Sequence, residues 1–61
     1  MTWIVFFNYR YVAYDGLRTE TYAEEIEASD EDSARLTAAE LILSSLSNGE
    51  TAEITEVSHV A

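Results

Sequence analysis

The stretch Trp3-Ile-Val-Phe-Phe-Asn-Tyr-Arg-Tyr-Val-Ala-Tyr14 is almost continuously apolar or aromatic, with Asn8 and Arg10 as its polar members. β-Branched and aromatic residues favour strands, and the chain contains no proline that would interrupt one. A strand with apolar side chains on both faces is typical of a position inside a sheet. The sequence therefore predicts that residues 2–14 form the central strand around which the rest of the chain folds.

Asp15-Gly16 follows at once and predicts a tight turn into a second strand over residues 17–28. Asp-Gly between two strand-like segments is typical of a type I′ hairpin, whose two central residues both have positive φ. A two-residue loop pairs Tyr9 with Tyr22, and we prefer this register. A three-residue loop with a glycine bulge pairs Arg10 with Glu20 instead, and this alternative stays open. In the preferred register one face carries Trp3, Val5, Phe7, Tyr9, Tyr11, Tyr22, Ile26 and Ala28.

Ser29-Asp-Glu-Asp32 predicts the start of a helix over residues 30–47, with the Ser29 hydroxyl as the cap and acidic residues at the positive end of the helix dipole. Asn48-Gly49 predicts its end, with Gly49 in the left-handed conformation. Apolar residues cover an arc of about 220° around this helix, wider than the stripe of roughly 100° that one buried face requires. We therefore expect part of the helix to remain uncovered.

Residues 51–60 predict a third strand, although its alternation is weak because Ala52 and Ile54 lie in one phase and Val57 in the other. The helix returns the chain so that this strand runs parallel to the second one. A right-handed crossover then places it on the far side of the first. We expect one α+β domain over residues 1–61, a two-layer ββαβ fold with a three-stranded antiparallel sheet of order 2-1-3 and the helix on one face.

Acidic residues dominate the charged part of this 61-residue chain, which has twelve Asp and Glu against three Arg and a net charge of −9. This balance disfavours direct binding to nucleic acid or to an anionic membrane and favours a basic partner. The chain has no cysteine, leader-like segment or apolar run long enough to cross a membrane, so we expect a cytoplasmic protein. We also expect no enzymatic activity, cofactor or metal site, because no catalytic or calcium-loop motif is present and the lone His59 lies near the chain end.

Carboxylates follow both predicted outer strands, where they would form rows of negative charge. Such rows could imitate a nucleic-acid backbone and occupy the basic groove of a protein that reads phosphates through Arg and Lys. The other interpretation is that charged side chains protect exposed strand edges from pairing with another sheet. The predicted acidic partner-binding surface consists of Glu20, Glu24, Glu25, Glu27, Glu53 and Glu56.

A second set of residues has no place in the predicted core, because it lies on the sheet face opposite the helix or on the outer part of the helix arc. Exposed apolar groups of this kind usually mark an interface, and we expect a homo-oligomer, with a dimer favoured. The predicted self-association surface consists of Ile4, Phe6, Val12, Tyr14, Leu36 and Leu43.

The leading functional hypothesis is a non-enzymatic binding or inhibitor protein that occupies the basic surface of a nuclease or another nucleic-acid-binding protein. In size and charge the chain resembles the DNA-mimic and anti-defence proteins of phages, a resemblance that would place it in the cytoplasm of an infected host. The alternative is a self-associating assembly module whose acidity serves solubility. Salt distinguishes the two, because capture of a basic partner weakens with ionic strength and apolar assembly does not.

Overall fold

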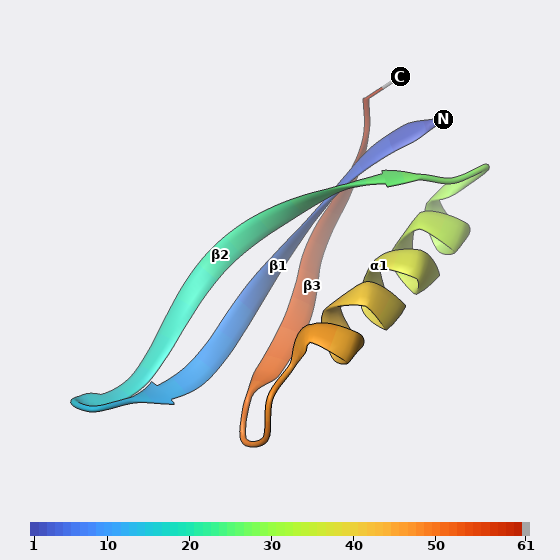
Figure 1. Cartoon of the computed structure of the whole chain (residues 1–61). Coiled ribbons are helices and arrows are strands. Elements are labelled where there is room, and N and C mark those ends of the chain that lie inside the picture. Colours follow the sequence, from blue (N-terminus) through green and yellow to red (C-terminus); the bar gives the residue numbers. More distant parts are fainter. Residues whose placement is uncertain (61) are drawn as a thin grey trace.

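The computed structural model describes residues 1–60 and has four elements, strands β1 (Thr2–Ala13) and β2 (Gly16–Glu27), helix α1 (Glu31–Ser45) and strand β3 (Thr51–His59). The strands form one antiparallel sheet of order β2-β1-β3, and α1 packs on one face (Figure 1). The predicted α+β fold with sheet order 2-1-3 is confirmed. The first and third strands start at the predicted residues, and the other element ends differ from the predicted ones by one or two residues, within the usual uncertainty of such boundaries.

The β1–β2 turn lies one residue earlier than predicted. Tyr14 and Asp15 form the loop. Of the residues described only Gly16 and Gly49 have positive φ, so Asp15 lacks the positive φ that a type I′ turn requires. The predicted type I′ turn at Asp15-Gly16 is therefore wrong. Both predicted registers are wrong as well, because Tyr9 lies opposite Glu20. The preferred register, with Tyr9 opposite Tyr22, is wrong by two residues, and the alternative, with Arg10 opposite Glu20, is wrong by one. The observed register places Phe7 directly opposite Tyr22, with ring centroids 5.8 Å apart, and Trp3 opposite Ile26.

A shift of two residues leaves every side chain on its original face, so the division of the sheet into two faces agrees with the preferred register. The core lies on the α1 side of the sheet and is small. Its seven buried residues are Trp3, Val5, Phe7, Ile26, Ala34, Ala38 and Ile42. Two of the three helix residues in this set are alanines, whose small side chains let α1 lie close to the sheet.

A β-bulge at Thr55 explains why the third strand shows weak alternation in the sequence. Phe6 pairs with Glu56 and Phe7 with Ile54, so Thr55 is an extra residue without a partner in β1. Its hydroxyl donates a 3.3 Å hydrogen bond to the Phe6 carbonyl oxygen. Because the bulge changes the phase of the strand, Ile54 and Val57 both pack against the core although three positions separate them.

The helix is capped by a different residue from the one predicted. Asp30 is the N-cap, and its carboxylate accepts a 2.7 Å hydrogen bond from the Ser33 backbone N–H. Ser29 therefore lies one position too early to serve as the cap. The helix ends at Ser45, and Leu46 is its C-cap with extended backbone angles, so the helix stops before the predicted end at Asn48-Gly49. Gly49 does have positive φ (86°), but in a separate turn that a hydrogen bond from the Glu50 N–H to the Ser47 carbonyl closes.

The molecule is longer than a compact domain of its size, measuring 40 × 17 × 13 Å. Its radius of gyration is 12.5 Å, against about 10.5 Å expected for 61 residues. Figure 1 shows the cause, because the β1–β2 hairpin extends away from both α1 and β3 toward its turn. In β2 only Ile26 is buried, so nearly the whole edge strand is open to solvent.

Candidate functional site

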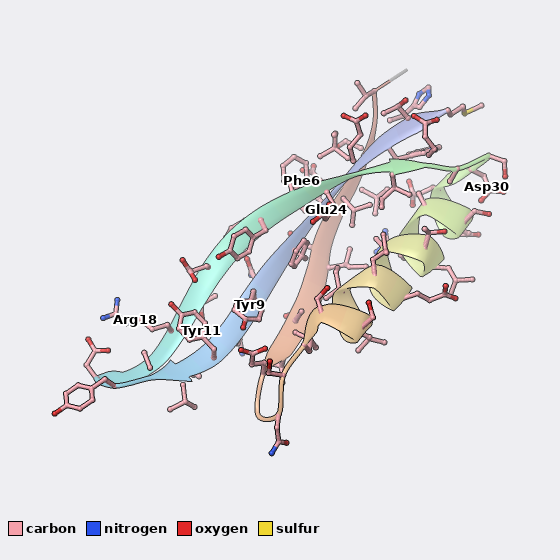
Figure 2. All side chains as sticks on the ribbon, viewed as in Figure 1. Phe6, Tyr9, Tyr11, Arg18, Glu24 and Asp30 are labelled. Carbon is pink, nitrogen blue, oxygen red and sulfur yellow. The ribbon has the colours of Figure 1, made fainter. Side chains whose placement is uncertain are left out.

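The sheet face opposite α1, which we call the open face, has an apolar centre. Ile4 and Phe6 on β1 point away from the core because alternate residues of a strand lie on opposite faces, and both side chains are half-buried between the outer strands. Ala23 lies beside Phe6 on β2. No other layer of residues 1–60 covers this group, so it is exposed on one side (Figure 2).

Four carboxylates lie along the two outer strands of the open face. On β2, Glu25 is opposite Ile4, and Glu27 follows on the same face. On β3, Glu53 is opposite Asn8 and Glu56 is opposite Phe6. Glu53 and Glu56 share this face only because the Thr55 bulge separates them, since residues three apart in a regular strand point to opposite faces. The open face therefore has an apolar centre with acidic residues on both sides.

The other two residues of the predicted acidic surface lie on the α1 side of β2. Glu20 accepts a 3.2 Å hydrogen bond from the Tyr22 hydroxyl, and Glu24 lines a groove beside the helix. The structure thus brings together Glu25, Glu27, Glu53 and Glu56 but does not join Glu20 and Glu24 to them. On β3, sequence spacing could not reveal that Glu53 and Glu56 share the open face, because the bulge changes the face of every residue beyond it.

Few of the acidic groups are neutralised within the part of the chain that the structure describes. Arg18 pairs with Asp15, Arg35 pairs with Glu31 at 3.6 Å, and the N-terminal ammonium lies 3.7 Å from Glu27. These contacts join solvent-exposed groups and contribute little to stability. Arg10 lies on the open face between Thr19 and Thr51 and makes no ion pair with the residues described.

The predicted self-association residues fall in three separate places. Ile4 and Phe6 form the centre of the open face, Val12 and Tyr14 are exposed at the hairpin turn, and Leu36 and Leu43 lie on the outer side of α1. The two helix leucines are 63% and 67% exposed. They account for the apolar arc of the helix that the sheet cannot cover.

Tyrosines gather on the α1 side of the hairpin, toward its turn (Figure 2). Tyr9 stacks on Tyr11 at 5.3 Å and meets the edge of Tyr22 at 6.1 Å. Hydrogen bonding to Glu50 raises the pKa of Tyr9 to about 12 and lowers the pKa of Glu50. A hydrogen bond to Glu20 is the main cause that raises the pKa of Tyr11, whereas for Tyr22 loss of solvation comes first. These contacts hold the phenols protonated and give them a packing role.

A groove of about 460 Å³ separates this tyrosine cluster from the second half of α1. Phe7, Tyr9 and Tyr22 form its sheet side, and Leu41 and Leu46 are on its helix side. Sequence reasoning assigned the strand aromatics to the core and did not anticipate a groove. The feature of the sequence that could have predicted the groove is the number of aromatic residues in β1, which is larger than a 15-residue helix with two buried alanines can cover.

Comparisons with protein-family models, with curated proteins and with solved structures found no match. Within residues 1–60, no group of three or more His, Asp or Glu side chains is placed to hold a metal ion. Among the same residues α1 is the one helix, and it lacks the length and apolar character needed to cross a membrane. The open face, an apolar centre between two rows of carboxylates, is the candidate functional site.

Proposed function

We propose that the protein is a non-enzymatic binding protein whose open face occupies the basic surface of a nuclease or another nucleic-acid-binding protein. The observation that carries this proposal is the arrangement of Glu25, Glu27, Glu53 and Glu56 on both sides of a half-buried apolar centre that no other layer covers. Specific protein interfaces commonly have an apolar centre and a polar rim. A partner that complements this face would place Lys or Arg around an apolar patch of its own.

The spacing of the acidic rows is compatible with nucleic-acid mimicry. β2 and β3 lie on either side of β1, so their side chains are about 10 Å apart across the face. The major groove of B-DNA is about 12 Å wide, and the separation of the two acidic rows is closer to this width than to the roughly 6 Å of the minor groove. A protein surface built to bind two phosphate rows would therefore meet carboxylates at similar positions.

Unpaired charge supports the same proposal through the rate of encounter. A net charge of −9 on so small a chain attracts a basic surface over distances of about 8 Å at physiological salt. Complementary potentials raise association rates and reject acidic competitors. An inhibitor of phage type, acting in the host cytoplasm against a nuclease, would benefit from both effects.

The same charges argue against a dimer in which two open faces meet. Such a dimer would place the four carboxylates of one copy against those of the other, and like charges brought together in an interface are unfavourable. The alternative function, a self-associating assembly module, is favoured by a different observation, namely the exposed leucines on the outer side of α1.

A capture experiment tests the proposal. The tagged protein should retain basic nucleic-acid-binding proteins from host lysate at low salt, and raised salt or added duplex DNA should release them. Glu25→Lys/Glu56→Lys should abolish capture, because both changes lie beside the apolar centre. The matched control is Glu20→Lys/Glu24→Lys, which makes the same change in net charge on the other face. Equal loss with both pairs would reduce the effect to net charge and would refute the open face as the binding site.

A further inference from the structure

The outer side of α1 carries a short apolar stripe that the fold leaves uncovered. Leu36, Ala39 and Leu43 follow each other at spacings of three and four residues, the a-d-a pattern with which helices pack side by side. At 100° per residue Leu36 and Leu43 lie at least about 100° from Ala34, Ala38 and Ile42, which face the sheet, and the half-buried Ala39 lies about 60° from Ile42. Both leucines are mostly exposed, and Ala39 between them would let a second helix approach closely.

The charged residues beside the stripe are complementary to a second copy of the same helix. Arg35 immediately precedes Leu36, and Glu40 immediately follows Ala39, so they occupy the g and e positions of the heptad. In a parallel pair of helices the g residue of one chain lies next to the e residue five positions later in the other. A parallel pair therefore brings Arg35 beside Glu40 of the second copy, and the two-fold axis creates this contact twice.

Antiparallel packing of the same stripe lacks this complementarity. Two antiparallel helices can align these apolar residues in two ways. The first alignment places Glu40 beside Glu40 of the second copy. The second places the Asp32 carboxylate against Leu43 of the second copy. In the parallel pair Asp32 occupies the d position one heptad before Ala39 and meets Asp32 of the second copy, but it lies in the first turn of α1, where the two helices can diverge.

From these positions we propose that the chain forms a parallel homodimer through Leu36, Ala39 and Leu43 of α1, with reciprocal contacts between Arg35 and Glu40. This surface is separate from the open face, so the dimer would present two open faces on its outer sides. It does not depend on the function proposed above, and each can fail without the other.

Single cysteines test the orientation directly, because the chain has none of its own. Residues at matching d positions of a parallel pair lie close enough for a disulfide, whereas an antiparallel pair brings different residues together. Under mild oxidation Ala39→Cys should give a covalent dimer, and Thr37→Cys, on another side of the same helix, should remain a monomer. Equal crosslinking of both variants, or of neither, would refute the parallel dimer.

Sedimentation equilibrium provides the second measurement. At about 1 mM, where even weak contacts between proteins are populated, the native chain should sediment as two copies of 6.9 kDa. Leu43→Gln should shift it to the monomer, whereas Leu41→Gln, which alters a half-exposed leucine facing the groove on the same helix, should not. A monomeric native chain at this concentration would overturn the proposal.

The charge contacts have a test of their own. Arg35→Glu and Glu40→Arg should each weaken the homodimer, because each places like charges side by side. An equimolar mixture of the two variants should restore dimerisation, since both contacts in the mixed dimer are then between opposite charges. A mixture that associates no better than its components would contradict the proposed arrangement.

Discussion

Replacing Val5 by alanine should lower the free energy of unfolding by about 2 kcal/mol. Val5 is the largest side chain that is fully buried, and it lies between Glu24 and Val57 on the neighbouring strands. The change removes two methyl-sized groups, each worth about 0.8 kcal/mol when buried, and leaves a cavity that adds to the loss. A domain of this length is expected to have a stability of about 3–9 kcal/mol, so the substitution removes a large part of it.

Val12→Ala is the matched control, because Val12 lies on the same strand but is 77% exposed. Both substitutions reduce strand propensity in the same way, whereas only Val5→Ala removes buried contacts. Urea unfolding followed by circular dichroism should show the Val5→Ala midpoint lower by about 2 M, for a slope of about 1 kcal/mol per M. Val12→Ala should stay within about 0.5 kcal/mol of the native protein. Equal losses in the two variants would refute the assignment of the core to the α1 side alone.

Three further predictions concern charge and register. A hydrogen bond to Glu50 raises the pKa of the Tyr9 phenol to about 12. The protonated phenol therefore stabilises the fold below pH 10, and this contribution is lost as the pH rises through 12. Tyr9→Phe should reduce the fall in melting temperature at alkaline pH. Hydrogen bonding to Ser33 lowers the pKa of Asp30, so its stabilisation is lost as the pH falls below 3.8; Asp30→Asn should show a smaller acid-induced fall in melting temperature between pH 7 and pH 3. Deletion of Thr55 should leave a folded protein, because β3 then alternates regularly, whereas deletion of Asn8 from β1 should prevent folding as judged by circular dichroism.

The architecture could be predicted because each element has a local cause in the sequence. The apolar run of β1 requires a central position, the turn residues separate the strands, and the crossover rule then decides the strand order. The register could not be predicted in the same way. It depends on which large side chains meet across the strands, Phe7 with Tyr22 and Trp3 with Ile26, and on the loop residues adopting negative φ.

The candidate site was only partly predictable, because a face is a property of three strands together. Glu25 and Glu27 could be placed from alternation within β2. Glu53 and Glu56 could not, since their shared face depends on the bulge at Thr55, for which the sequence has no glycine or other usual mark. The helix cap was missed for a related reason, because Ser29 and Asp30 are both good cap residues and the choice depends on where the strand before them ends.

The exposed β2 strand has one more consequence. The Ala28 backbone N–H donates a hydrogen bond to the Met1 carbonyl oxygen of the neighbouring strand. In an antiparallel ladder the residues of a strand alternate between bonding to the neighbour and facing away from it, so the backbone groups of the odd-numbered β2 residues, from Leu17 to Glu27, face outward. A long edge with free amide and carbonyl groups is a template on which further chains can polymerise. At neutral pH the glutamates of β2 repel an incoming copy of this strand. Salt that screens this repulsion lowers the barrier, and fibril growth at high salt would extend the sheet from this edge.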